Sequence, residues 1–251
     1  MSATTKKADG VISTGRGDIP YVLTRSRKRR RVSITIDQQA CVKVAAPFFV
    51  SETAIVSFIE QKKDWIVKHY ERAAEHKSVV DKKKFVTGGQ FIFQGQFFSL
   101  KVVLADSRRG RIDFDGEKWT VAVPVDLTGP AREKFVQEEM VDWYRQQAEE
   151  ILGGRVFHYA RILNVMPEKI TVRTQKHLWG SCHYGKKSVN LNWKLVMMTP
   201  DVMDYVVVHE LCHLIHPNHS AAFWKEVGKI IPDLKARQKW LKDNRPHLSL
   251  P

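Results

Sequence analysis

The residues best suited to do chemistry lie together in the run His209-Glu210-Leu211-Cys212-His213. Residues four positions apart in a helix share one face, about one turn apart, so both imidazoles can bind the same metal ion. Glu210 projects roughly 80° to the side, because a helix has about 3.6 residues per turn. From there it can reach a water molecule on the metal without being a ligand. This is the His-Glu-x-x-His pattern, in which two histidines bind zinc and the glutamate acts as general base.

A catalytic zinc ion needs a third protein ligand and one open position for water. His219 follows His213 by six residues, which is the spacing of the extended pattern His-Glu-x-x-His-x-x-Gly-x-x-His. This chain has His216 in place of that glycine, followed by Pro217, which disfavours helical geometry at His216. We expect the helix to end there and the chain to turn back toward the metal. His219 is the favoured third ligand, and His216 is the alternative.

The metal-binding pattern lies on a segment that is predicted to be a buried helix. Thr199-Pro200-Asp201 is a typical helix start, with an N-cap, a proline at the first position and a carboxylate at the positive end. Residues 202–215 are apolar nearly all round, which favours burial. Without an ion, the polar side chains of the pattern would be buried there at a cost in free energy. Ser220 is expected to cap an amphipathic helix that follows.

The rest of the chain alternates between strand-like and helical patterns. Residues 1–18 are small, polar and aperiodic, which predicts a loose tail. Ser51 can cap one helix, and Gly153-Gly154 can end another that begins near Pro130. Period-two alternation of apolar and polar residues predicts β-strands at residues 32–36, 42–46, 91–93, 97–104, 112–114, 119–123, 170–173 and 189–195.

The chain resembles a known family in several of its segments. The sequence from His209 to Trp224 resembles the metal site of the YgjP-like family, which is related to the SprT-like and WLM metallopeptidases within the zincins. Trp179-Gly180-Ser181-Cys182 and residues 189–195 are similar to the second signature of the same family. The resemblance extends from about residue 20 to 245. It implies a zinc ion held by His209, His213 and His219, with Glu210 as the base.

Pattern and resemblance together predict an α+β fold in three parts. We expect a flexible tail at residues 1–18, a β-rich region with one helix at 19–127, and a zincin-like catalytic domain at 128–247. The predicted function is that of a zinc-dependent hydrolase, in the manner of a metallopeptidase, acting on a peptide or protein. Three imidazoles also accept other divalent transition metals such as Ni²⁺ or Mn²⁺.

Two other functions remain open. The YgjP-like family is also linked to nucleoside triphosphate hydrolysis with uridine triphosphate as the suggested substrate, so the resemblance allows a metal-dependent pyrophosphatase. The net charge of +14, from 41 basic and 27 acidic residues, would suit a polyanion. The run Arg25–Arg31 contributes six of the basic residues and can bind phosphates or simply protect a strand edge. The alternatives are therefore a nucleotide hydrolase and a basic, nucleic-acid-associated zinc protein.

Composition also bears on the compartment. No run approaches 18 apolar residues and the first residues lack the apolar core of a signal peptide, so we expect a cytoplasmic protein with no membrane segment. Three cysteines (Cys41, Cys182 and Cys212) cannot form a disulfide framework. Cys212 lies about 80° from the mean direction of the two helix histidines, which favours a small buried residue over a metal ligand.

Overall fold

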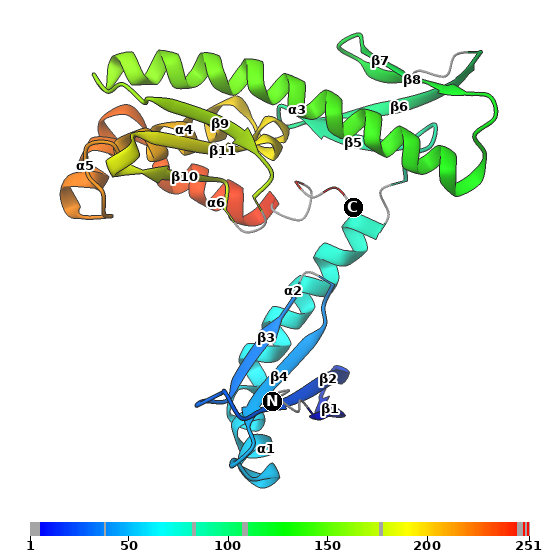
Figure 1. Ribbon diagram of the computed structural model, residues 1–251, viewed down its shortest axis with the longest axis vertical. Coiled ribbons are helices and arrows are strands. Elements are labelled where there is room, and N and C mark those ends of the chain that lie inside the picture. Colours follow the sequence, from blue (N-terminus) through cyan, green and yellow to red (C-terminus); the bar gives the residue numbers. More distant parts are fainter. Residues whose placement is uncertain are drawn as a thin grey trace. The chain divides into compact units, whose positions relative to one another are not determined.

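The computed structural model describes residues 6–37, 39–81, 84–106, 110–175, 178–244, 248 and 250. The chain divides into two compact units, which are Met1–Lys82 (unit 1) and Lys83–Pro251 (unit 2). Both units combine helices with β-sheets, so the predicted α+β class is confirmed (Figure 1). Within the described parts of the chain, no helix combines the length and the hydropathy that crossing a bilayer requires.

Unit 1 is a four-stranded sheet with two helices. The strands run in the order β1-β2-β4-β3, with β2 and β4 parallel and the other neighbours antiparallel. Apolar side chains of the sheet, such as Ile12 and Val44, are buried together with Ile55 and Ile66 of the helices. The elements are β1 (Lys6–Thr14), β2 (Gly17–Ser26), β3 (Ser33–Ile36), β4 (Val42–Pro47), α1 (Glu52–Gln61) and α2 (Lys63–Asp81).

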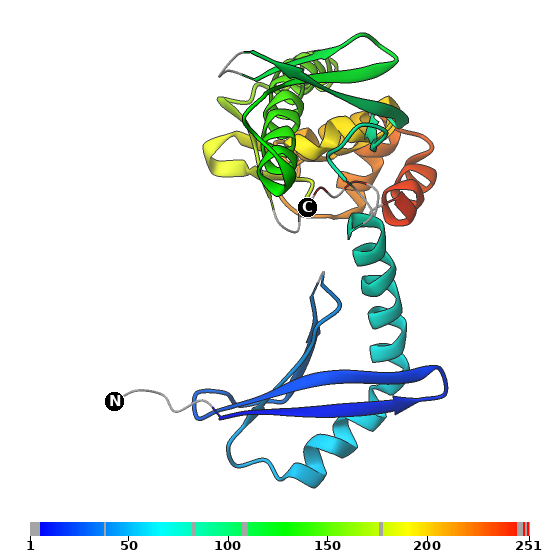
Figure 2. The ribbon, with the colours of Figure 1, turned by 90° about the vertical axis from the view of Figure 1, so that its right-hand side faces the viewer.

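The predicted flexible tail is wrong for the described residues 6–18. Lys6–Thr14 forms β1, which pairs with β2 along its whole length in a long hairpin (Figure 2). An edge strand is held by backbone hydrogen bonds and needs few apolar side chains. Among the β1 side chains whose burial the structure describes, residues 9–14, only Ile12 is buried, at 2% exposure, so the segment shows no alternation of apolar and polar residues. Residues 1–5 lie outside the described residues.

The helical part of unit 1 also differs from the prediction. Ser51 caps α1 as expected, since its hydroxyl accepts a hydrogen bond from the amide of Ala54 at 3.2 Å. The helix then breaks at Lys62, and α2 starts directly afterwards, so there are two helices where one was predicted. The helical spacing of apolar residues continues across the break from Ile59 to Ile66, so the sequence pattern does not reveal the break.

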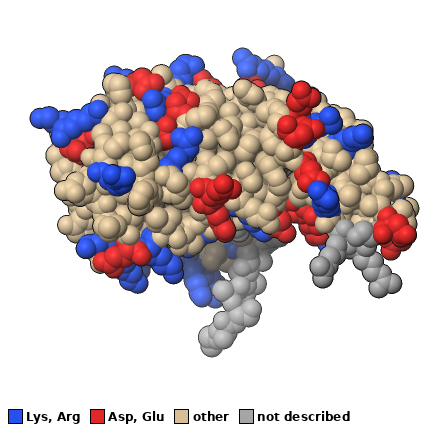
Figure 3. Space-filling view, turned by 90° about the horizontal axis from the view of Figure 1, so that it is seen from above, with Lys and Arg blue, Asp and Glu red and all other residues tan. Residues whose placement is uncertain are grey.

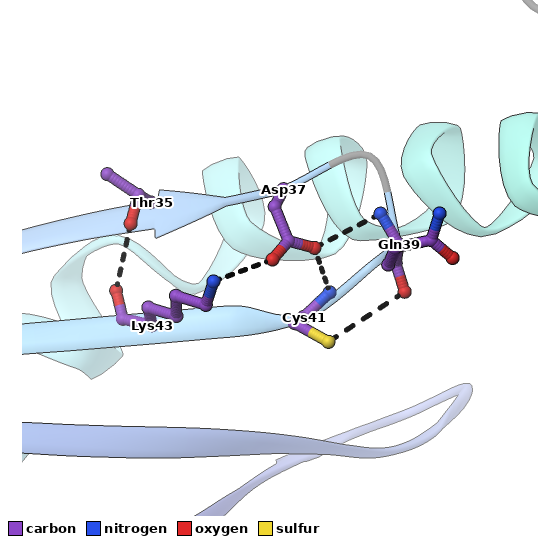
Figure 4. A network of polar contacts seen from close by, with 5 residues as sticks. All are labelled: Thr35, Asp37, Gln39, Cys41 and Lys43. Atoms are coloured by element: carbon purple, nitrogen blue, oxygen red, sulfur yellow. Dashed lines mark hydrogen bonds and ion pairs between the residues drawn. The ribbon is translucent and has the colours of Figure 1, made fainter.

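A compact polar network closes the connection between β3 and β4 (Figure 4). The Asp37 carboxylate accepts hydrogen bonds from the backbone amides of Gln39 (3.1 Å) and Cys41 (2.9 Å). It also forms an ion pair with Lys43 (2.8 Å). Asp side chains favour such turns because they satisfy backbone N–H groups that have left the sheet. The network fixes the position at which β4 begins.

Unit 2 begins with a four-stranded sheet that is covered by one long helix, α3. The strands run in the order β5-β6-β8-β7. Trp119 of β8 is fully buried among aromatic rings, and Tyr144 of α3 donates a hydrogen bond to the carbonyl of Ile92 at 2.8 Å. The elements are β5 (Gln90–Phe93), β6 (Gln96–Ala105), β7 (Arg111–Phe114), β8 (Lys118–Pro124) and α3 (Gly129–Ile162).

Helix α3 does not end at Gly153-Gly154, so that prediction is wrong. Two glycines inside a helix cost roughly 1 kcal/mol each relative to alanine. The buried stripe nevertheless continues from Leu152, before the glycines, to Val156 and Ala160 after them, and this packing maintains the helix. As a result α3 packs against both sheets of unit 2.

The second half of unit 2 carries a smaller sheet and three helices. Its strands run in the order β10-β11-β9, with β9 parallel and β10 antiparallel to β11. The turn at Gly95 joins the two halves, because its amide donates to the carbonyl of Met197 at 3.1 Å. The elements are β9 (Lys169–Arg173), β10 (Gly180–His183), η1 (Tyr184–Lys186), β11 (Ser188–Asn192), η2 (Trp193–Met197), α4 (Pro200–Cys212), α5 (Ala221–Ile230) and α6 (Leu234–Asn244).

The predicted boundary between residues 127 and 128 does not separate two units. One hydrophobic core joins side chains from both sides of it, including Phe91 and Trp119 before it and Tyr144 and Leu211 after it. The division lies instead at residues 82 and 83. Residues 125–128 only connect β8 to α3, the helix that covers its sheet.

Candidate metal centre

Helix α4 forms as its first residues predict and is held on several sides. Thr199 is the N-cap and Pro200 is at the first helical position. Asp204 of α4 forms an ion pair with Arg155 of α3, and Arg237 of α6 donates a hydrogen bond to the carbonyl of Asp201 at 2.6 Å. The helix packs against α3, α5, α6 and β10. These contacts set the position of the residues at its C-terminal end.

Three histidines converge at that end. One ligand atom each of His209, His213 and His219 lies within 4.8 Å of the others. Nε2 of His209 and Nε2 of His219 are 3.1 Å apart. The chain leaves α4 after His213 and turns, and Ser220 then caps α5 by accepting a hydrogen bond from the amide of Phe223 at 3.3 Å. The turn therefore brings His219 back to the helix without a glycine.

His216, the alternative third ligand, takes a different place. Its side chain is not in the three-histidine cluster of the described residues. Its backbone carbonyl lies 3.1 Å from Nδ1 of His213 and can accept a hydrogen bond from it. A histidine that donates through Nδ1 keeps its Nε2 lone pair free for a metal ion. His216 thus orients a candidate ligand through its backbone.

The three imidazoles fit a zinc ion. Bonds of 2.0–2.1 Å in a tetrahedral site place two ligand nitrogens about 3.3 Å apart, close to the 3.1 Å between His209 and His219. Burial, with the charges of His213 and His219, lowers the pKa of His209 to about 4. Burial also lowers the pKa of His213. Both rings are therefore neutral near pH 7, as a metal ligand must be.

Two aromatic residues of α5 support the histidine rings. Phe223 stacks on His213 with ring centroids 4.5 Å apart, and Trp224 stacks on His219 with centroids 5.6 Å apart. Phe223 is fully buried, and its ring centroid also lies 5.0 Å from that of His209 and 4.9 Å from that of His219. Stacking restricts the rotation of the imidazoles and holds their nitrogens toward one point.

Glu210 lies beside the cluster in a buried position. Only 6% of its surface is exposed, and burial raises the pKa of its carboxyl to about 8. The space that it occupies exists because residue 180 on β10 is a glycine. A Cβ atom on Gly180 would lie 2.5 Å from Cγ of Glu210. The segment Trp179–Cys182 therefore contacts the metal-binding pattern His209–His213, through Gly180 and Glu210.

Gly180→Ala is expected to lower the free energy of unfolding by about 1–3 kcal/mol, because the added methyl group overlaps the buried Glu210 side chain. Urea denaturation measures the change. Gly185→Ala is the matched control, since the nearest atom to its Cβ would be 3.7 Å away in His183. Equal stability of the two variants would show that Glu210 does not occupy the space beside Gly180.

The histidines and Glu210 line a cavity of about 460 Å³. Tyr205, one turn before His209 on α4, also lines it and is 7% exposed. The hydroxyl of Tyr205 accepts a hydrogen bond from Nε2 of Gln238 on α6 at 2.9 Å. Sequence reasoning identified neither Tyr205 nor Gln238. The spacing of four residues between Tyr205 and His209 was the available signal.

The cysteines near the site are not part of the histidine cluster. Cys212 is fully buried, and burial together with the charge of Glu226 raises the pKa of its thiol to about 12. Cys182 lines the cavity, and burial followed by the charge of Glu210 raises the pKa of its thiol to about 11. Both thiols stay protonated near neutral pH, which agrees with the interpretation of Cys212 as a small packing residue.

Comparison with known proteins identifies a family and similar solved structures. The search of curated proteins finds no significant match. The crystal structure of the metallopeptidase zymogen of Pyrococcus abyssi abylysin is 22% identical, with a TM-score of 0.35, over 38% of this chain and 95% of that one. The model of the YgjP-like metallopeptidase domain matches residues 30–244. The chain therefore belongs to the YgjP-like metallopeptidase family, whose members are hydrolases that depend on a metal ion.

Proposed function

We propose that this protein is a zinc-dependent peptidase that cleaves an extended segment of polypeptide. In this proposal His209, His213 and His219 hold the ion, and Glu210 is the general base. The observation that supports it is the single cavity that brings the three histidines, the buried carboxyl group and the edge strand β10 together. When bound, the metal ion supplies Lewis-acid polarisation and lowers the pKa of water at the site.

Glu210 supplies the proton transfers. Its carboxylate can accept a proton from the attacking water and pass it to the nitrogen of the cleaved peptide bond. The neighbouring contact with Gly180 holds the carboxyl group at one side of the cavity. Glu210 directly follows His209 in α4, so its side chain lies next to a candidate ligand but is not part of the histidine cluster.

The free edge of β10 favours a peptide as the substrate. β10 has β11 as its neighbour on one side and no strand on the other in the described sheet. The amide of Asn192 donates to the carbonyl of Trp179 at 2.8 Å, which marks this pair as a hydrogen-bonded pair of the ladder. Antiparallel pairs alternate, so the backbone groups of Gly180 and Cys182 point away from β11. An extended peptide can pair with them there as an added strand.

The lining of the cavity weighs against a nucleoside triphosphate. Its described lining residues include no lysine and no arginine. Enzymes that bind triphosphates place such cations, or a glycine-rich loop before a helix, against the phosphates. Gly180 lies in a strand and the residues after it form η1 and β11, so no such loop is formed by the described residues.

Tyr205 is the proposed donor to the carbonyl oxygen of the substrate. Because its hydroxyl accepts a hydrogen bond from Gln238, its own proton is free to be donated elsewhere. Burial is the main cause that raises the pKa of Tyr205, so the hydroxyl remains protonated at neutral pH. A donor fixed in this way stabilises negative charge on the oxygen in the transition state.

Tyr205→Phe is expected to lower kcat about 10²-fold with little change in metal content, because only the hydroxyl is removed. Cleavage rates and zinc content are measured on the same preparations. Tyr184→Phe is the control, since Tyr184 is 54% exposed on η1. If both variants cleave at the wild-type rate, Tyr205 is not the donor.

The substrate class can be tested directly. Zinc-loaded protein is incubated with an unfolded, fluorescein-labelled protein and, separately, with a panel of nucleoside triphosphates. We expect new peptide termini by mass spectrometry and no pyrophosphate. Release of pyrophosphate from uridine triphosphate by the wild type but not by Glu210→Gln would replace the peptidase proposal with the nucleotide hydrolase.

A further inference from the structure

Unit 1 carries a concentrated positive charge that its own acidic residues do not neutralise. The connection between β2 and β3 contains five exposed cations in a row, Arg27, Lys28, Arg29, Arg30 and Arg31. Within the described residues none of the five forms an ion pair, whereas Arg16, Lys43 and Lys63 of the same unit do. On the face of unit 2 seen in Figure 3, basic and acidic side chains are instead interspersed.

Two exposed aromatic residues follow β4, and the ring of the first lies beside one of these cations. Phe48 and Phe49, between β4 and α1, are 36% and 79% exposed. The guanidinium carbon of Arg27 is 5.9 Å from the centroid of the Phe48 ring. Arg25, at the end of β2, donates a hydrogen bond from Nη1 to the carbonyl of Val50 at 2.6 Å. The basic connection and the phenylalanines therefore form one surface, the Arg/Phe surface (residues 27–31, 48 and 49).

We propose that the Arg/Phe surface binds single-stranded nucleic acid, with phosphates on the arginines and a base stacked on Phe49. Four of the five cations are arginines, whose planar forks suit phosphate oxygens. One of them is already oriented, because Nη1 of Arg29 donates to Oγ of Ser33 at 2.8 Å. An exposed ring next to cations is the arrangement by which proteins hold unpaired bases.

Two features favour a single strand over other polyanions. In a duplex the bases are stacked on each other, so the exposed face of Phe49 would have no partner. An acidic bilayer takes up larger apolar areas, usually the face of an amphipathic helix. The Arg/Phe surface offers two rings on a short connection between a strand and a helix. The surface belongs to unit 1, so the inference does not depend on the proposed peptidase activity.

The test uses the full chain and a fluorescent 20-nucleotide strand of deoxythymidine, with fluorescence anisotropy measured at several salt concentrations. The variant Lys28→Glu/Arg30→Glu/Arg31→Glu is expected to bind at least tenfold more weakly. The slope of log affinity against log salt should fall by about 2, since each phosphate contact on a single strand contributes about 0.7. The control Lys62→Glu/Lys68→Glu/Lys77→Glu makes the same change in charge at exposed positions of the helical part of unit 1 and should bind as the wild type does.

The aromatic part of the proposal has its own variant. Phe49→Ser should weaken binding about fivefold or more, whereas Phe157→Ser, at a 67% exposed phenylalanine of unit 2, should not. Melting curves and zinc content should match the wild type in every variant. If the glutamate variant does not fold, Lys28→Gln/Arg30→Gln/Arg31→Gln replaces it with the same expected direction.

Three results would overturn the proposal. Equal losses in both triple variants would show that net charge alone attracts the strand. Binding of a duplex as tight as that of the single strand, unaffected by Phe49→Ser, would remove the stacking contact. Binding to phosphatidylserine vesicles without binding to oligonucleotides would identify the surface as a membrane contact instead.

Discussion

Glu210→Gln is expected to lower the rate of peptide cleavage by about 10²–10⁴-fold while zinc stays bound at about one equivalent. Glutamine has the shape of glutamate but cannot accept a proton from water. The side chain is 6% exposed and contacts the backbone at Gly180, so a change in size would disturb the site, whereas this change alters only the chemistry. Cleavage of a labelled unfolded protein and zinc content measure the two effects separately.

The variant also removes a carboxyl group from a buried position, where its charged form is disfavoured. We therefore expect no loss of stability in thermal unfolding. Glu226→Gln is the matched control on α5, where Glu226 pairs with Lys229 near the surface, and it should cleave at close to the wild-type rate. A Glu210→Gln protein that keeps a tenth or more of the wild-type activity would contradict the assigned role.

His219→Ala is expected to weaken zinc binding by about 100-fold or more. Loss of a hydrogen bond to a ligand already costs 10–100-fold in affinity, and here the ligand itself is removed. The remaining histidines, His209 and His213, would hold the ion through two bonds only. Zinc content after dialysis against a competing chelator measures the loss, and peptide cleavage should disappear with it.

His216→Ala is the control that separates the two candidate third ligands. The structure uses the backbone carbonyl of His216, which alanine retains, so zinc content should be unchanged. Full zinc in His219→Ala together with loss of zinc in His216→Ala would reverse the assignment. The two substitutions lie three residues apart in one turn, which makes them comparable in their effect on folding.

Local patterns predicted the geometry around His209. Spacing by four residues placed His213 on the same helix face, and Pro217 predicted a helix end at His216 from which His219 could return. The helix α4 ends earlier, at Cys212, but the chain does turn back before His219. These features depend on neighbours in sequence. Gly180 was noted only as part of the resemblance, without its contact to Glu210, and Tyr205 and Gln238 were not identified. Their roles arise from packing between β10, α4 and α6, which no local pattern contains.

The errors in the predicted fold have a related cause. β1 carries few apolar residues, so its pairing with β2 left little trace in the hydropathy pattern. Gly153-Gly154 is a reasonable helix end by propensity, but burial of Val156 and Ala160 overrides it. The division of the chain was misplaced because the long helix α3 joins two sheets into one core, and only tertiary contacts show this.

X-ray absorption spectroscopy of the zinc-loaded protein tests the central claim most directly, because it counts and identifies the atoms around the ion. The account predicts three imidazole nitrogens at about 2.0–2.1 Å, one further oxygen and no sulfur. The imidazole signal should fall by one ring in any His219→Ala protein that still holds zinc. A sulfur neighbour near 2.3 Å, or a closed site with no oxygen, would contradict the assignment of His209, His213 and His219 as the ligands of a catalytic ion.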